Sequence, residues 1–231
     1  IGRKEAKPAK QAGEFAEDLF KAFRLLLFPV QIAATAQDKF RRILATAFNA
    51  VPQERRIDLQ PQTIPSILQI AGPIYEHIKY MDENVILFEL FEELLARSID
   101  SERISEAHPS FICIISQLSR DEAIILLELR RNDFDFCISF YVERETNRFV
   151  NRKVDYCSFP ADKLLFAGNF EMYCDHLEKL GVVGQTMINN DSIMDEHHQQ
   201  IGNKQSFKIY LTHFGRFFVH ACVPKKGFRN K

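Results

Sequence analysis

The chain has 231 residues, of which 46% are hydrophobic and 26% are charged. This balance is typical of a globular protein and excludes disorder throughout the chain, while nine glycines and nine prolines exclude collagen-like and low-complexity classes. The formal net charge of -1 combines +5 in residues 1–56, -9 in residues 57–135 and +3 in residues 136–231. This uneven distribution of charge along the chain indicates modules that either attract one another in the fold or meet different partners. In the second case, the basic N-terminal part would meet an anionic partner.

The N-terminal part is predicted to be a tether followed by an amphipathic helical segment. Residues 1–13 are rich in Lys, Ala and Pro and should be flexible, and residues 14–50 have helical periodicity broken at Pro29. The apolar and basic side chains of this segment suit either a core or oligomer contact or a membrane surface. The residues of this candidate membrane or partner face are Phe20, Phe23, Leu26, Leu27, Lys39, Arg41 and Arg42.

A helical domain is predicted over residues 62–118. Within it, Asp82 is a good N-cap for a helix that runs to Ile99, on which Glu89, Glu92 and Glu93 fall largely opposite the apolar positions. Adjacent side chains on a helix do not face each other, so a solvated acidic face is expected there rather than a paired acid and base.

Residues 119–223 are predicted to form a winged-helix-like module with a strand insert at 134–158, and residues 224–231 a basic tail. Ser119 and Glu122 have capping-box spacing, and the alternating phenylalanines of the insert indicate a strand with a partner at 149–157. A later helix should end at Gly181, followed by strands at 183–188 and 206–211 around a polar loop. The expected fold class is therefore α+β, mainly α with small β elements.

A winged helix raises the alternative of DNA binding through the helix that ends at Leu180. That helix carries Glu171, Asp175 and Glu178, which would repel phosphates, so protein contact is expected instead. The candidate nucleic-acid contacts lie on the wing side and are Lys204, Lys208 and Arg216.

The sequence offers few motifs for catalysis or metal binding. Phosphate-binding loops, nucleophile elbows and zincin motifs are missing, and the five cysteines form no C-x-x-C pair, as expected of free thiols in a reducing compartment. Residues 195–198 read Asp-Glu-His-His, but adjacent side chains rarely converge on one metal ion, so a solvated loop is expected. His108, before Pro109, should cap or orient a helix, and His213 and His220 should pack at the edge of a core. No cofactor, metal or catalytic residue is predicted.

Several blocks, taken in order, resemble the bacterial Abi-alpha family. They occupy residues 26–30, 90–99, 108–111, 117–123, 177–182 and 211–222, so that the resemblance extends over roughly residues 15 to 222. The insert at 134–158 departs from the family pattern. The motif positions, which we expect to be structural, are His108, Pro109, Phe111, Leu118, Glu122, Leu180, Gly181, Thr212, Gly215 and Phe218.

Abi stands for abortive infection, so the resemblance implies a role in defence against bacteriophage. We expect a non-enzymatic, cytoplasmic protein that acts through a protein partner, a homo-oligomer or a membrane surface. If it acts at a membrane surface, it would be a peripheral membrane protein. No small-molecule substrate is indicated. The first alternative is a winged-helix regulator that binds nucleic acid, and the second is a nuclease or hydrolase that uses His197 and His198.

Overall fold

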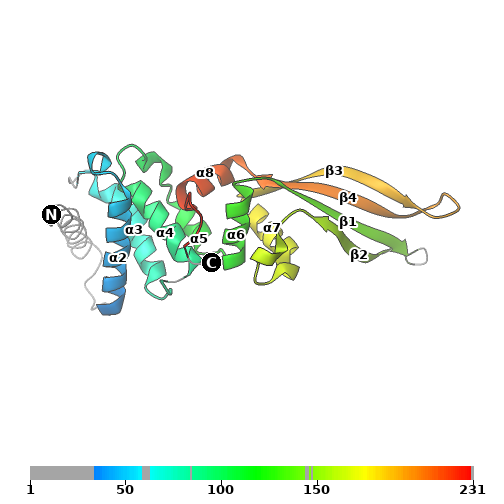
Figure 1. The fold of residues 1–231 in the computed structure, drawn as a ribbon, viewed down its shortest axis with the longest axis horizontal. Coiled ribbons are helices and arrows are strands. Elements are labelled where there is room, and N and C mark those ends of the chain that lie inside the picture. The colour runs from blue at the N-terminus through cyan, green and yellow to red at the C-terminus, as the bar shows by residue number, and fades with distance from the viewer. Residues whose placement is uncertain (1–33, 59–62, 84, 144–145, 147, 230–231) are drawn as a thin grey trace, which may run out of the picture. The chain divides into compact units, whose positions relative to one another are not determined.

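The computed structural model describes residues 34–58, 63–83, 85–143, 146 and 148–229 (Figure 1). The chain divides into two compact units. The first contains the residues up to Ala123 together with those from His220 onward, and the second is Ile124–Val219. The predicted tether and the four apolar face residues, which are Phe20, Phe23, Leu26 and Leu27, lie outside the described residues.

The first unit is helical. Helices α2 (Ala34–Ala50), α3 (Ile64–Ile78) and α4 (Ile86–Ser98) lie side by side, and the short α5 (Ser110–Ile115) also packs on α4 (Figure 1). Ten of the thirteen residues of α4 are buried, because α4 has neighbours on several sides. Among the fully buried side chains are Phe40 of α2 and Tyr75 of α3, whose rings meet edge to face with centroids 5.2 Å apart.

The capping box predicted at the start of α6 (Arg120–Leu129) is confirmed. The Ser119 Oγ atom accepts a hydrogen bond from the Glu122 amide at 3.3 Å, and the Glu122 carboxylate accepts one from the Ser119 amide at 2.6 Å. This reciprocal pair satisfies two amide groups that the first turn of a helix would otherwise leave without partners.

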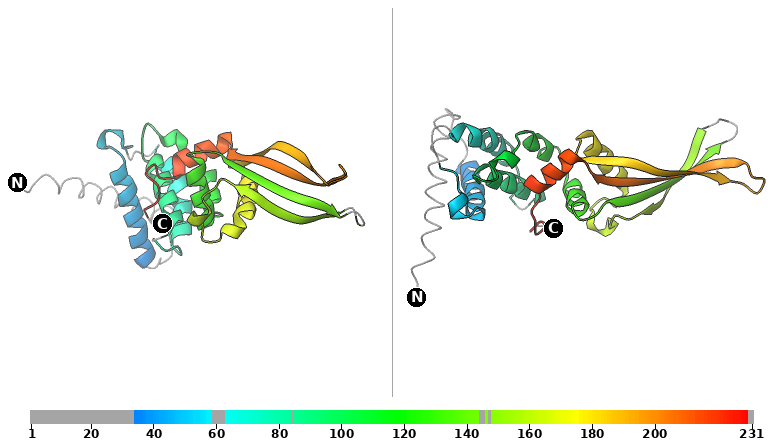
Figure 2. Two further views of the ribbon diagram at one scale, coloured as in Figure 1. Left: turned by 45° about the vertical axis from the view of Figure 1, so that its right-hand side comes forward. Right: turned by 90° about the horizontal axis from the view of Figure 1, so that it is seen from above.

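The second unit contains an antiparallel sheet in the order β2-β1-β4-β3. The predicted insert forms β1 (Phe134–Glu143) and β2 (Arg148–Cys157), and the second hairpin forms β3 (Val183–Met194) and β4 (Gln200–Leu211). Figure 2 shows the two hairpins separating toward their tips, consistent with the β1–β4 register, which ends at the pair Tyr141 and Gly202. At the other end the sheet carries an aromatic core, in which Phe136 contacts Phe170 of α7 (Phe170–Lys179).

The second hairpin is longer than predicted, and the expectation of a loop over residues 189–206 is wrong except near its centre. Its strands extend through a run of Asn, Asp, Ser and Gln residues that has no apolar and polar alternation, because most of the outer half of β3 is exposed. Sequence alternation reveals a strand where one face is buried, and this half of the hairpin lacks such a face.

The end of α7 and the start of α8 (His213–Cys222) are tied together by short hydrogen bonds. Gly181 has a φ of +74°, and the amides of Val182 and Gly181 donate to the carbonyls of Leu177 and Glu178 at 3.1 and 2.8 Å, which closes α7 as a Schellman motif. Thr212 then caps α8 by accepting from the Gly215 amide at 2.8 Å, and its own amide donates to the Val182 carbonyl at 3.1 Å.

The α+β class is confirmed. Between β1 and α7 the described residues form β2 and two short 3-10 turns, Ala161–Lys163 and Ala167–Asn169. These elements do not test the winged-helix assignment or the predicted domain boundaries, which remain predictions. Among the described residues, no helix combines the length and the hydrophobicity that a bilayer crossing requires.

The joint between α7 and α8 predicts that Gly215→Ala is strongly destabilising. A Cβ atom at this position would lie 1.8 Å from the Val182 carbonyl oxygen, so the backbone would have to move. We expect a loss of about 3 kcal/mol or more in the free energy of unfolding, measured by urea denaturation.

The matched control is Gly168→Ala, since a Cβ there has no neighbour within 4 Å. We expect this change to alter stability by no more than about 0.5 kcal/mol. Equal losses for the two variants would show that the close approach of Gly215 to Val182 does not constrain the fold.

Candidate functional site

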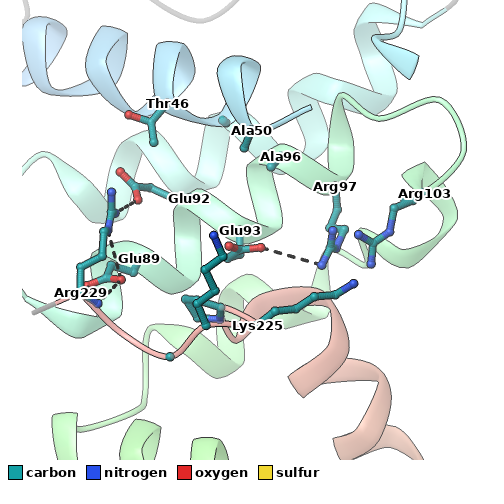
Figure 3. Close-up of a pocket in the computed structure, with 14 residues that line it drawn as sticks. Thr46, Ala50, Glu89, Glu92, Glu93, Ala96, Arg97, Arg103, Lys225 and Arg229 are labelled. Carbon is teal, nitrogen blue, oxygen red and sulfur yellow. Dashed lines mark hydrogen bonds and ion pairs between the residues drawn. The ribbon is translucent and has the colours of Figure 1, made fainter. Parts of the chain in front are cut away.

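A cavity of about 490 Å³ lies within the helical unit (Figure 3). Its walls come from α2, from α4, from Arg103 and from the C-terminal segment, residues 224–229. Three acidic and two basic side chains of this set come from the helices and the loop after them, and the C-terminal segment adds three more cations. The charged lining residues are Glu89, Glu92, Glu93, Arg97, Arg103, Lys225, Lys226 and Arg229.

One end of the cavity holds a buried carboxylate. Glu89 is only 2% exposed, and its two oxygens accept hydrogen bonds from the Arg229 amide at 3.1 and 2.9 Å. The Arg229 guanidinium lies 3.4 Å from Glu89 and also bonds Glu92. A buried carboxylate is costly without such partners, so Glu89 fixes the C-terminal segment on α4. The expected solvated acidic face is thus wrong at Glu89.

The electrostatics of this end follow from that burial. Burial raises the pKa of Glu92, and the charge of Arg229 and the bond it donates only partly offset the effect. Burial alone would lower the pKa of Arg229, but the charges and hydrogen bonds of Glu92 and Glu89 raise it. Arg229 is therefore joined to both carboxylates by hydrogen bonds and ion pairs.

Arg97 and Arg103 form the other end of the cavity (Figure 3). Arg97 is 7% exposed, and its Nη2 atom donates to the His220 carbonyl at 3.1 Å. Burial lowers the pKa of Arg97, and the nearby charge of Arg103 lowers it further. Burial would raise the pKa of Glu106, but the hydrogen bonds and the charge of Arg103, helped by Arg97, lower it instead.

The five cysteines are free, as predicted, but not all are buried. Cys222 is completely buried beside this end of the cavity, and burial raises the pKa of its thiol well above the ordinary value. Cys113 is exposed, because α5 is a short helix that contributes only part of its surface to the core. A raised thiol pKa keeps Cys222 protonated and unreactive.

The family-motif residues do not line the cavity. In the first unit, the His108 Nδ1 atom accepts from the Ser110 amide at 3.2 Å at the start of α5, while Pro109 directly precedes that helix. Phe111 and Leu118 are buried, and Glu122 belongs to the capping box. The other five motif positions lie at or beside the α7–α8 joint, and they are Leu180, Gly181, Thr212, Gly215 and Phe218.

Two cations of the predicted membrane or partner face have partners within the helical unit. The Lys39 Nζ atom donates to the Met81 carbonyl at 2.6 Å, and the Arg42 Nε atom donates to Glu83 at 3.0 Å. Arg41 is exposed. This part of the face is therefore used at least partly for intramolecular contacts.

The candidate nucleic-acid residues are exposed in the second unit. Lys204 and Lys208 lie on the same face of β4, where Lys204 is in register with Asp191 and Lys208 lies 4.0 Å from Asp135. Arg216 is exposed on α8. Acidic residues therefore accompany both lysines.

The acidic and histidine-rich segment forms the turn of the second hairpin. The Asp195 carboxylate accepts from the amides of His197 and Gln199, both at 2.9 Å, so it shapes the turn. His197 and His198 are exposed. Across the described part of the chain, no three His, Cys, Asp or Glu side chains are placed to hold a metal ion.

The cavity residues were missed by the sequence analysis. The C-terminal segment was read as a basic tail, and Arg97 and Arg103 carried no motif. The sequence offers only two separate signals, the glutamates at 89, 92 and 93 and the cations of residues 225–231, and neither specifies that the two meet.

The buried carboxylates predict a pH dependence. Because the pKa of Glu92 is raised in the fold, its contribution favours the folded state at low pH and is lost as pH rises through that raised pKa. As pH rises from acid to neutral, the free energy of unfolding of Glu92→Gln should therefore fall less than that of the unmodified protein. Urea unfolding at a series of pH values measures this difference.

Glu106→Gln is the counterpart of opposite sign. The pKa of Glu106 is lowered, so this group adds stability above its ordinary pKa and loses it as pH falls through the lowered value. The stability of Glu106→Gln relative to the unmodified protein should fall as pH rises. The electrostatic account fails if both variants show the same pH slope.

Comparison with known proteins places the chain in one family. The family model described as abortive infection alpha matches residues 33–222. No curated protein and no solved structure matches the chain. Because the match covers most of the sequence and includes both units, the chain belongs to the abortive infection alpha family.

Proposed function

We propose that this protein acts in abortive infection, the defence against bacteriophage after which its family is named, as a non-enzymatic protein that binds a partner protein through strand β3. The family match supports the biological role, and the exposed edge of β3 supports the mode of action. The free cysteines agree with action in a reducing compartment, for which the bacterial cytoplasm is our proposal.

The observation that carries the binding mode is the contrast between the two edges of the sheet. Strand β3 exposes Met187, Ile188 and Met194 at 47%, 54% and 54%, and its single charged residue is Asp191. Strand β2, at the other edge, has four charged residues among ten. Proteins usually protect exposed edges with charges, so an edge with one charged residue, although its register shifts between Met187 and Asn189, accepts another strand along its regular parts.

The partner in this proposal supplies an extended segment that pairs with β3. Main-chain hydrogen bonds would provide part of the affinity, and the exposed methionine and isoleucine side chains would provide apolar contact. A second copy of this chain is a further source of such a strand, and the oligomeric state under assay conditions separates the two sources.

The cavity charges support a non-enzymatic role. Glu89 is bonded by Arg229, and the pKa of Glu106 is lowered by its contacts with Arg103, whereas burial raises the pKa of Glu92. A general acid or base needs a group whose proton can move near neutral pH, and pairing with arginine opposes that requirement at Glu89 and Glu106.

A nucleic-acid-binding regulator is the second candidate. The strand order β1-β4-β3, with α7 before the β3–β4 hairpin, agrees with a winged-helix-like arrangement, and Lys204 and Lys208 are exposed on β4. Asp175 and Glu178 of α7 argue against it, whereas the charge of Glu171 is offset by its pairing with Arg152 at 2.7 Å. DNA binding that falls steeply with salt and is lost when Lys204, Lys208 and Arg216 are replaced would favour this candidate.

The proposed edge contact is tested by adding charge to β3. Met187→Lys combined with Met194→Lys places two lysines on exposed positions, which should block strand addition while leaving the fold intact. Plaque formation on cells with this variant should approach that on cells without the protein, with expression and thermal unfolding matched to the unmodified protein.

The control places the same two charges at the opposite edge. Val154→Lys with Tyr156→Lys changes exposed residues of β2, at 43% and 57%, and should retain protection. Full protection by the β3 variant would refute the edge contact. Equal loss of protection in both variants would also refute it, because added charge anywhere on the sheet would then suffice.

A further inference from the structure

We infer that this protein associates with a second copy of itself through two faces of the second unit, one on α8 and one on α7 with the loop before it. The residues of the α8 face are His213, Phe214, Arg216 and Phe217. The residues of the α7 face are Leu165, Phe166, Met172 and Asp175. Both faces lie within Ile124–Val219. The inference goes beyond the proposed β3 contact and does not depend on it.

The α8 face combines aromatic rings with an arginine. Arg216 and Phe217 lie three and four positions after His213, so the three share one side of the helix, and each is exposed. The Phe217 side chain is 55% exposed, and its ring meets the His213 ring edge to face with centroids 5.0 Å apart. Within the part of the chain that the structure describes, the Arg216 guanidinium makes no ion pair.

The α7 face combines large apolar side chains with a carboxylate. Met172 and Asp175 lie three positions apart on the exposed side of α7, and Met172 is 53% exposed. Leu165 and Phe166, which are 64% and 65% exposed, come directly before the 3-10 turn that leads into this helix. Monomeric proteins rarely expose several large apolar side chains close together, so this group indicates a contact surface.

The charges of the two helices are complementary. Helix α7 carries three carboxylates and one lysine, and Arg152 of β2 pairs with one of these carboxylates, Glu171, while its charge also acts on Asp175. When both cations are counted, one negative charge remains on α7. Asp175 also accepts a long hydrogen bond, of 3.4 Å, from the neutral Gln185 amide. Helix α8, by contrast, has Arg216, two histidines and no carboxylate.

A second copy of this chain therefore presents a face that matches each of these two. Arg216 of one copy can pair with Asp175 of the second copy, and Phe217 can pack on Met172, because a thioether and an aromatic ring attract each other. Aromatic side chains, methionine and arginine are also enriched in protein interfaces. Nucleic acid suits these faces less well, because the α7 carboxylates repel phosphates and the α8 face offers a single arginine.

Sedimentation velocity of the intact protein, across a wide range of concentrations, tests the inference. The unmodified protein should associate reversibly, and more weakly at high salt, because salt screens exposed charges. Arg216→Glu and Asp175→Lys should each weaken association about tenfold or more, and Phe217→Ala should do so without a change of charge. All three positions are exposed, and thermal unfolding verifies that the variants are folded.

The most specific variant combines Arg216→Glu with Asp175→Lys in one chain. The two charges are then exchanged, so the ion pair between copies can form again, and association should recover toward that of the unmodified protein. The matched control is Lys204→Glu, which reverses one exposed charge on β4, outside both faces. This control should associate as the unmodified protein does.

A protein that stays monomeric at every concentration overturns the inference, even if it binds DNA through Arg216. A double variant that associates no better than the two single variants also overturns it. So does association that Met187→Lys with Met194→Lys abolishes and Arg216→Glu leaves intact, because β3 would then join the copies. Phage protection by the β3 variants is measured separately, so failure of the proposed function is distinguishable from failure of this inference.

Discussion

The buried carboxylate of Glu89 is the contact on which the C-terminal part of the helical unit depends. A charged group that is 2% exposed is strongly unfavourable unless it is hydrogen-bonded and paired, and the amide and guanidinium of Arg229 supply those partners. The segment that carries Arg229 must therefore lie on α4. Its position brings Lys225 and Lys226 to the cavity wall.

The two units place different chemistry at the surface. The helical unit encloses a charged cavity, whereas the second unit presents a long, nearly uncharged edge strand. The family match ends at residue 222, so the cavity is completed by residues that lie beyond the matched region.

Local rules predicted the parts of the structure that local interactions determine. The capping box at Ser119 and the helix end at Gly181 depend on residues within a few positions, and sequence spacing is sufficient to recognise them. The first hairpin was also predictable, because the phenylalanines of β1 alternate over a buried face. These features fixed the α+β class and the order of most elements.

The remaining features depend on partners far away in the sequence. Glu89 and Arg229 are 140 residues apart, and nothing in the glutamate-rich pattern of α4 specifies a contact with the chain end. The outer part of β3 has polar residues in a mostly exposed strand, so its pattern resembles a loop. Tertiary contacts, rather than propensity, decide both features.

Hydrogen exchange at the Arg229 amide tests the central claim most directly. In the intact protein this amide donates to a buried carboxylate, so its exchange should be slowed to the extent seen in the well-protected amides of α4. In Glu89→Gln, the Arg229 amide should retain some protection but exchange faster than it does in the unmodified protein. An Arg229 amide that exchanges as fast as an unstructured peptide in the unmodified protein would contradict the account, because the C-terminal segment would then not be fixed on α4.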